Sequence, residues 1–274
     1  MRVNSPHAPE ARYGTERETR WTGYKVHLTE SCDADTPHLL TDVQTTLATT
    51  ADNTVTAAIH ADLAEARLLP RQHPVDAGYV DADNLATSRR DHGVDLVGPA
   101  LGDHHGQART DGAFDVDCFA VEWGARRVVC PRGCASVGWA ETRDPFANAV
   151  ITVRFGRADC AACPARARCT RAARGPRRLT LRPQPQHRAL RAARARQGTP
   201  EFKAEYAARA GVEGTLAQGI RACDLRQARY AGLAKTRLQH LLTAAAMNFA
   251  RLGAWFAGRP RAATRPSRLA ALAA

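Results

Sequence analysis

The stretch TGYKVHLTESCDADTPHLLTDVQTT, residues 22–46, decides the fold of this chain. Apolar and polar side chains alternate through residues 22–31, and residues 37–46 form a second run rich in β-forming side chains. The segment CDADT between them has the composition of a turn. These residues therefore predict an antiparallel β-hairpin.

The residues that follow the hairpin predict a helix. Its apolar positions recur at roughly helical spacing, at Val55, Ile59, Leu63 and Leu68. Asn53 stands just before them, in the position of an N-cap. We expect a helix of about four turns over this segment.

Two short strands and a second helix come next along the chain. HPVDAGYV, residues 73–80, predicts an apolar strand that ends at Asp76 and is broken by Gly78. The polar amphipathic segment after it predicts a helix closed by Gly93, and residues 94–100 predict a buried strand. Strands joined through helices indicate a mixed α/β sheet layered by helices.

The sequence becomes strongly helical after residue 183. Its last helical segment carries an apolar stripe, and we expect this stripe to pack on the sheet. The stripe consists of Leu233, Leu238, Leu241, Leu242, Ala245, Phe249 and Leu252.

The distribution of charge favours a nucleic-acid partner for one half of the chain. Residues 1–150 hold 14 Lys and Arg against 22 Asp and Glu, whereas residues 151–274 hold 25 against 5. A basic half suits DNA, because each phosphate that a cationic side chain neutralises releases counterions. The alternative is a solubilising surface produced by an Arg- and Ala-rich genome composition.

Length and hydropathy place the chain among globular proteins. Its 274 residues, 44% of them hydrophobic, are enough for a sizeable core. It has no apolar run as long as the roughly 18 residues that a membrane helix needs, and its first residues lack the apolar core of a signal peptide. We expect a cytoplasmic, nucleoid-associated protein with no membrane partner.

In EYAARAGVEG, residues 205–214, three functional side chains share one helix face. Tyr206, Arg209 and Glu213 are spaced i, i+3 and i+7. Metal-assisted phosphoryl transfer needs an oxygen ligand for Mg²⁺, a cation that orients the phosphate and a group beside it, roles that Glu213, Arg209 and Tyr206 can fill in that order. The plainer interpretation is a surface ion pair between Arg209 and Glu213, worth roughly a few tenths of a kcal/mol.

This spacing resembles the Y-(2)-R-(3)-E-(6)-K signature of one large branch of bacterial DDE-domain insertion-sequence transposases. The final Lys is not matched, because Ile220 occupies its position, and Arg221 is a candidate for the same phosphate contact. HPVDAGYV resembles the second-Asp D-x-G-Y region of that branch, and GYKVHL resembles the hairpin strand before it. The three blocks stand in the family's order and cover most of the chain.

The resemblance implies an RNase H-like mixed sheet flanked by helices, in an enzyme of a mobile element that cleaves and joins DNA with Mg²⁺, or with Mn²⁺ in its place. Asp76 and Glu213 are then the catalytic, metal-binding carboxylates. Tyr206, Arg209 and Arg221 are then the contacts to DNA phosphate at element ends and target. Without the resemblance, Asp76 would be interpreted as a turn former that bonds its own backbone.

The resemblance also implies a first catalytic Asp on a strand upstream of the hairpin. Residues 1–20 are polar and aperiodic, and Asp42 belongs to the second arm of the hairpin, so we expect this strand to be missing. The chain is then the C-terminal part of a transposase, N-terminally truncated and inactive alone. Its expected partners are DNA, a second copy of itself and an N-terminal fragment encoded upstream.

Two other classes of protein compete with this interpretation. One is a non-catalytic, zinc-stabilised DNA-binding remnant of a decayed transposase, which the missing strand favours. The other is an unrelated metal-dependent hydrolase, which would carry a His-rich ligand motif such as HExxH, and the sequence has none.

The predicted organisation has five parts. Residues 1–20 are a disordered start and residues 21–100 are the first part of the RNase H-like core. Residues 101–182 are a cysteine-rich β insertion before the C-terminal helices. Residues 183–257 are the helical part of the core that carries Glu213, and residues 258–274 are a basic tail.

Five of the eight cysteines fall within the predicted insertion, at Cys130, Cys134, Cys160, Cys163 and Cys169. In a cytoplasmic protein such a cluster favours a metal over disulfides. The C-x2-C spacing of Cys160 and Cys163 suits Zn²⁺, and the second pair would be Cys130 with either Cys169 or Cys134. The alternative is a set of reduced, buried thiols, as expected for Cys32, Cys118 and Cys223.

Overall fold

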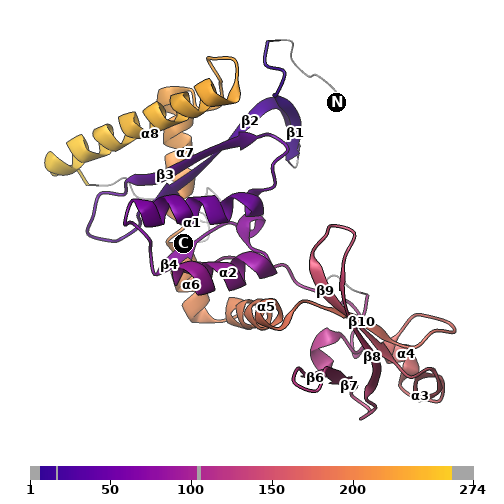
Figure 1. The fold of residues 1–274 in the computed structure, drawn as a ribbon. Coiled ribbons are helices and arrows are strands. Elements are labelled where there is room, and N and C mark those ends of the chain that lie inside the picture. The colour runs from indigo at the N-terminus through magenta and orange to yellow at the C-terminus, as the bar shows by residue number, and fades with distance from the viewer. Residues whose placement is uncertain (1–6, 17, 104–105, 261–274) are drawn as a thin grey trace, which may run out of the picture. The chain divides into compact units, whose positions relative to one another are not determined.

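The computed structural model describes residues 7–16, 18–103 and 106–260 (Figure 1). Most of the predicted basic tail, residues 261–274, lies outside the described residues. Among the described helices, none has both the length and the apolarity needed to cross a bilayer.

The chain folds into two compact units, and each is described here by itself. Unit 1 comprises residues 1–80, 87–99 and 196–274. Unit 2 comprises residues 81–86 and 100–195. Both contain strands and helices, so the expected mixed α/β class is confirmed. The described strands form separate parallel and antiparallel sheets, however, and not the single mixed sheet that was expected.

Unit 1 begins with an antiparallel sheet of order β1-β2-β3. Its strands are β1 (Arg12–Glu16), β2 (Thr19–Glu30) and β3 (Leu40–Leu47), and the pairing of β2 with β3 confirms the predicted hairpin. The prediction of disorder over residues 1–20 is wrong at β1. This polar strand is ordered because its backbone pairs with the first half of β2.

The hairpin leads into η1 (Asp52–Val55) and α1 (Thr56–Glu65). The predicted helix is confirmed, but Asn53 does not cap it, because a 3₁₀ turn starts one residue earlier and contains Asn53. Of its predicted apolar positions, Val55, Ile59 and Leu63 form a buried cluster. Leu68 lies beyond the end of the helix and is half exposed.

After α1 come β4 (Gln72–Pro74), η2 (Ala77–Tyr79), α2 (Ala82–His92) and β5 (Asp95–Val97). Strands β4 and β5 pair in parallel, as expected for strands joined through a helix. Gly93 has a φ of +68°, a left-handed conformation that glycine adopts without strain, and it follows the end of α2 as predicted.

The C-terminal part of the chain forms α5 (Gln184–Gln197), α6 (Pro200–Ala207), α7 (Ala210–Cys223) and α8 (Leu233–Phe256). In unit 1, α8 lies along β3, which confirms that this helix packs on the sheet (Figure 1). The predicted packing face is wrong. The residues that α8 buries are Thr236, Gln239, His240, Ala244 and Met247.

Hydrogen bonds explain why the polar side of α8 faces the sheet. His240 Nδ1 lies 2.8 Å from Thr45 Oγ1 of β3, and the Asn248 amide makes bonds of 2.8 and 2.9 Å with both backbone groups of Leu40. Arg251 reaches Glu30 at the end of β2 with an Nη1–Oε2 distance of 3.0 Å. Of the leucines predicted to lie inside, Leu238, Leu241 and Leu242 are thereby exposed, and Leu233 and Leu252 are half-buried.

Unit 2 contains the antiparallel sheet β10-β9-β8 and the separate pair β6-β7. The bounds of its strands are β6 (Ala120–Glu122), β7 (Arg127–Val129), β8 (Ser136–Arg143), β9 (Ala149–Phe155) and β10 (Arg178–Leu181). Short helical turns η3 (Val116–Cys118), α3 (Arg157–Ala161) and α4 (Arg166–Cys169) complete it. Its core includes Phe119, Val128, Val153, Phe155 and Leu181, and Cys130, Cys160 and Cys169 pack against that core.

Candidate active site

Asp76 lies two residues after β4 and starts the turn η2. Its Oδ1 accepts the backbone N–H of Ala77 at 2.7 Å, so Asp76 is a turn former, as one interpretation held. Its Oδ2 lies 3.4 Å from Nη2 of Arg209, and the side chain is 55% exposed. One carboxylate oxygen of Asp76 thus stabilises the turn, while the other faces Arg209.

Tyr206, Arg209 and Glu213 do not lie on one uninterrupted helix. Helix α6 ends at Ala207 and α7 begins at Ala210, with Arg209 as its N-cap residue. Ala208 and Arg209 both keep right-handed helical backbone angles, so the i,i+3 and i,i+4 neighbours still meet. Tyr206, Arg209 and Glu213 therefore lie on one side of the chain, as predicted, although α6 and α7 are separate helices.

Arg209 joins the two carboxylates. Its Nη1 lies 3.6 Å from Oε1 of Glu213, on the other side of the guanidinium from the Asp76 contact. The Arg209 side chain is only 21% exposed, whereas Glu213 is 76% exposed. Residues predicted from two distant segments are thus brought to one half-buried cation.

Aromatic side chains hold Arg209 in place. Its guanidinium lies over the ring of Tyr206, 5.9 Å from the centroid, and the Tyr206 ring stacks on buried Phe202 at 5.6 Å. Gln72 at the start of β4 donates to Glu205 on α6 at 3.1 Å, which ties the strand before Asp76 to the helix before Arg209.

A hydrogen-bonded chain fixes the turn that follows Asp76. The hydroxyl of Tyr79 lies 2.6 Å from Nδ1 of buried His27 on β2, and Nε2 of His27 lies 3.0 Å from Thr46 Oγ1 on β3. Burial, then the charges of Asp52 and Asp76, raise the pKa of Tyr79, and burial lowers the pKa of His27. Both groups are therefore neutral at pH 7 and anchor η2 to the hairpin.

Asp52 is a candidate residue that the sequence interpretation overlooked. It accepts from Lys25 Nζ at 2.8 Å, and it lies so close to Gly78 that a Cβ there would be 3.1 Å from its Oδ2. The glycine of the D-x-G-Y segment thus leaves room for a second carboxylate beside the turn. Nothing in the spacing of Asp52 to Asp76 indicated this contact.

Arg221 is not gathered into this group by its described contacts. Its Nε donates to the backbone oxygen of Ala217, one turn earlier on α7, and its side chain is exposed. Asp42, on the second arm of the hairpin, accepts from Gln44, and burial raises the pKa of Asp42 to about 6.

A groove of about 1090 Å³ opens beside Arg209 within unit 1. It is lined by the end of β2, by the segment from the end of α1 through β4, and by the turn between α6 and α7. Arg71, Arg89 and Arg209 line it together with several acidic side chains. A volume of this size admits a phosphate group and its neighbours.

The carboxylates fit a divalent cation in donor type, because Mg²⁺ and Mn²⁺ take oxygen ligands. Asp76 and Glu213 both keep oxygens open to solvent and share one cationic neighbour that a metal ion could replace. Within the part of the chain that the structure describes, no three His, Cys, Asp or Glu side chains form a metal-binding group.

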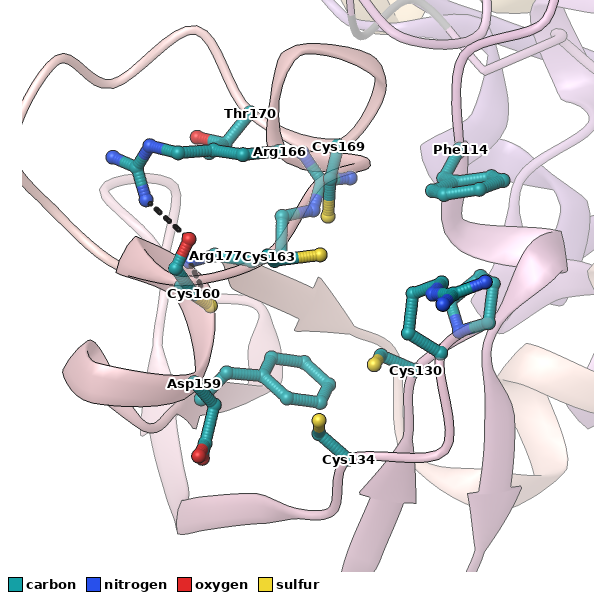
Figure 2. A pocket seen from close by; sticks show the side chains of 13 residues that line it. Phe114, Cys130, Cys134, Asp159, Cys160, Cys163, Arg166, Cys169, Thr170 and Arg177 are labelled. Atoms are coloured by element: carbon teal, nitrogen blue, oxygen red, sulfur yellow. Dashed lines mark hydrogen bonds between the residues drawn. The ribbon is translucent and has the colours of Figure 1, made fainter.

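In unit 2 all five cysteines of the predicted cluster line one small cavity of about 30 Å³ (Figure 2). Cys130 and Cys134 belong to one turn, in which the Cys130 N–H donates to the Cys134 carbonyl at 2.9 Å. The Cys160 sulfur accepts the backbone N–H of Arg177 at 3.5 Å. Cys163, between α3 and α4, and Cys169, at the end of α4, also line the cavity.

The remaining three cysteines do not share this surrounding. Cys32 and Cys118 are exposed and Cys223 is half-buried, so the expectation of buried thiols is wrong for the first two.

Within the cavity, burial raises the pKa of Cys134 and of Cys169, and neighbouring Cys130 raises both further.

Comparison with known proteins assigns the second half of the chain. Residues 129–253 match a family model described as a transposase DDE domain. The matched region is similar to a transposase DDE domain, and the match confirms the resemblance to DDE-domain transposases at this level. It includes Tyr206, Arg209 and Glu213, whereas Asp76 lies before its first residue. No curated protein and no solved structure matches the chain.

Proposed function

We propose that the chain supplies part of the active site of a DDE transposase, which cuts DNA at element ends and joins it to a target with Mg²⁺ or Mn²⁺. The observation that carries this proposal is the sharing of Arg209 between Asp76 and Glu213. Two acidic residues separated by more than a hundred positions meet at one cation, and one of them lies within the matched transposase domain. The plainer interpretation, a surface ion pair between Arg209 and Glu213, does not account for the contact of Arg209 with Asp76.

Each residue has a role that its position supports. Asp76 and Glu213 would hold the divalent cation, which supplies charge for attack on a phosphodiester. Arg209, buried on one side and open to the groove, would orient the scissile phosphate as a bidentate donor. Tyr206 keeps the guanidinium plane fixed, and Arg221 contacts phosphate farther along α7.

The order of elements supports an RNase H-like interpretation of unit 1. An antiparallel β1-β2-β3 sheet is followed by a helix and by two parallel strands, β4 and β5. The parallel pair forms a sheet of its own among the described residues. Unit 2 lies between segments of unit 1 in sequence, as an insertion with cysteines would.

We further propose that the chain binds DNA but does not cleave it alone. Two carboxylates hold a metal weakly, because two-metal catalysis uses a further shared carboxylate. The excess of 25 Lys and Arg over 5 Asp and Glu in residues 151–274 supplies the phosphate contacts.

The experiment combines Mn²⁺ binding, followed by electron paramagnetic resonance, with binding of a fluorescent random-sequence duplex. The wild-type chain should bind Mn²⁺, and Asp76→Asn and Glu213→Gln should each weaken that binding at least about tenfold, a loss of about 1.4 kcal/mol. DNA affinity should stay unchanged. Glu201→Gln, on the exposed first turn of α6, is the matched control.

Two results would contradict the proposal. Mn²⁺ binding that is equal in all four proteins would leave a DNA-binding remnant of a transposase as the function. Loss of DNA binding in Glu213→Gln, accompanied by a lower melting temperature, would make Glu213 a structural ion-pair partner.

A structural Zn²⁺ in unit 2 is our second proposal, and the shared cavity of the five cysteines favours it, although no three of them stand at metal-binding positions in the described structure. Its volume of about 30 Å³ has room for one small ion. Cys160, Cys163 and Cys130 would be ligands, with Cys134 or Cys169 as the fourth. The role would be to tie the turn of Cys130 and Cys134 to the segment that carries Cys160, Cys163 and Cys169.

A further inference from the structure

The outward face of α8 carries apolar side chains in a coiled-coil spacing. The positions are separated by 4, 3, 4, 3 and 4 residues, at Leu238, Leu242, Ala245, Phe249, Leu252 and Phe256. An alternation of three and four residues keeps one seam facing a partner helix along its whole length. A helix that packs only on a sheet does not need this repeat.

All seam residues except half-buried Leu252 are exposed, and the seam lies opposite the face that packs on the sheet. The exposed fractions are 57% for Leu238, 62% for Leu242, 76% for Phe249 and 81% for Phe256. If the seam residues occupy heptad positions a and d, His240 and Met247 both occupy position f, which points away from the seam. Both residues are buried against the sheet. The helix therefore presents two separate faces, of which one lacks a partner among the described residues.

We propose that α8 forms an antiparallel coiled coil with α8 of a second copy of this chain. The charges of the helix select this orientation. The only charged residues of α8 are Lys235, Arg237 and Arg251, and Arg251 is paired with Glu30. Parallel pairing would place Lys235 and Arg237 beside the same cations of the partner.

Antiparallel pairing separates these cations by about the length of the helix, roughly 36 Å for 24 residues. It also places Lys235 and Arg237 beside the C-terminal end of the partner helix. That end bears unpaired carbonyl groups and a partial negative charge. The distribution of charge on α8 therefore favours antiparallel pairing over parallel pairing.

Side-chain sizes fit the same arrangement. A two-fold axis at the level of residue 247 places Leu238 opposite Phe256, Leu242 opposite Leu252 and Ala245 opposite Phe249 of the other copy. The smallest seam residue then faces a large aromatic ring, as interdigitated packing requires. Self-complementarity of this kind is what a symmetric dimer interface needs.

The test is the mass of the full chain in solution, by sedimentation velocity over a range of concentrations. The wild-type chain, 29.7 kDa as a monomer, should sediment as a dimer. Phe249→Glu should raise the dimer dissociation constant by roughly 100-fold or more, because a charge replaces a central seam residue. Ala250→Glu, which places the same charge one residue outside the seam on the exposed surface, should leave the dimer intact.

A rescue experiment tests the orientation. Ala245→Lys and Phe249→Glu should each be monomeric alone and should form a heterodimer when mixed, because residues 245 and 249 face each other only in antiparallel pairing. Both positions are exposed, so circular dichroism should show the same fold as the wild type. A monomeric wild type, equal behaviour of Phe249→Glu and Ala250→Glu, or failure of the mixed pair to associate would each overturn the proposal.

Discussion

His60 on α1 and His73 on β4 face each other in unit 1, with 3.0 Å between Nε2 of His60 and Nδ1 of His73. Their residues are 1% and 9% exposed. Burial lowers the pKa of each imidazole to about 4, and the charge of His92 for His60, or of His60 for His73, adds to this effect. Both rings are therefore neutral at pH 7.

The first prediction is that unit 1 loses stability in mild acid. The unfolded histidines take up protons below their ordinary pKa of 6.5, whereas the folded pair does so only near 4. Stability is thus complete above pH 6.5 and falls between 6.5 and 4. Urea unfolding should show a loss on the order of 2 kcal/mol per histidine between pH 7.5 and 5.0.

Burial also lowers the pKa of His27 and of His240, so these residues add to the loss of stability in acid. A variant of His73 separates the contribution of the His60–His73 pair from theirs. His73→Gln should be less stable at pH 7.5 but should show a shallower decline toward pH 5.0 than the wild type. Equal slopes in the two proteins would mean that His73 is protonated in the folded state as readily as in the unfolded one.

A second prediction concerns the link between β2 and α8. The Glu30 side chain is 5% exposed, and it is bonded to Arg251 and to Thr215. Arg251→Met leaves this carboxylate without its cation, which costs about 3 to 5 kcal/mol when the pair is buried. Denaturant unfolding at pH 7.5 measures the loss.

The control for this variant is Arg90→Met, which removes the exposed pair with Asp91 and should leave the free energy of unfolding unchanged. Adding Glu30→Gln to Arg251→Met should restore part of the stability. If Arg251→Met behaves like Arg90→Met, the Glu30 contact does not stabilise the fold.

The sequence patterns predicted the helices and strands better than they predicted which side of a helix is buried. The hairpin, α1, α2 and the parallel strands follow from alternation, helical spacing and glycine positions, which are local properties. The face of α8 does not, because the usual rule places leucine inside. Here Asn248, His240 and Arg251 find partners on β2, β3 and the loop between them, and these long-range bonds decide which side is buried.

The candidate site was predicted in pieces. Spacing on α6 and α7 indicated Arg209 and Glu213, and a glycine turn indicated Asp76, but only the fold shows that Arg209 touches both carboxylates. The approach of Asp52 to Gly78 left no trace in the sequence, because it joins the turn after the hairpin to η2. Contacts between distant segments are what local patterns cannot carry.

A third prediction tests the zinc proposal. Protein purified without chelator should contain about one equivalent of zinc, and Cys160→Ser or Cys163→Ser should lose it together with part of the stability of unit 2. Cys134→Ser and Cys169→Ser separate the two candidates for the fourth ligand, because only the ligand's variant loses zinc.

Cys32→Ser and Cys118→Ser are the matched controls, since both thiols are exposed and outside the cavity. They should keep the zinc content of the wild type. Less than about half an equivalent in the wild type, with every thiol open to a thiol reagent, would make the cluster a set of reduced cysteines.

The last prediction separates the two roles of Arg209. In the described structure its guanidinium neutralises Asp76 and Glu213, so it competes with a divalent cation for the same oxygens. Arg209→Gln should therefore tighten Mn²⁺ binding several-fold while it weakens DNA binding and lowers the salt slope of DNA affinity by about 1, the value for one lost phosphate contact. Arg221→Gln, on exposed α7, should leave Mn²⁺ binding unchanged. Opposite shifts of the two affinities in one variant follow only if Arg209 serves both the carboxylates and the phosphate. If Mn²⁺ affinity stays constant and the melting temperature falls instead, Arg209 is a structural link between η2 and α7, because a purely structural cation would affect folding and not metal binding.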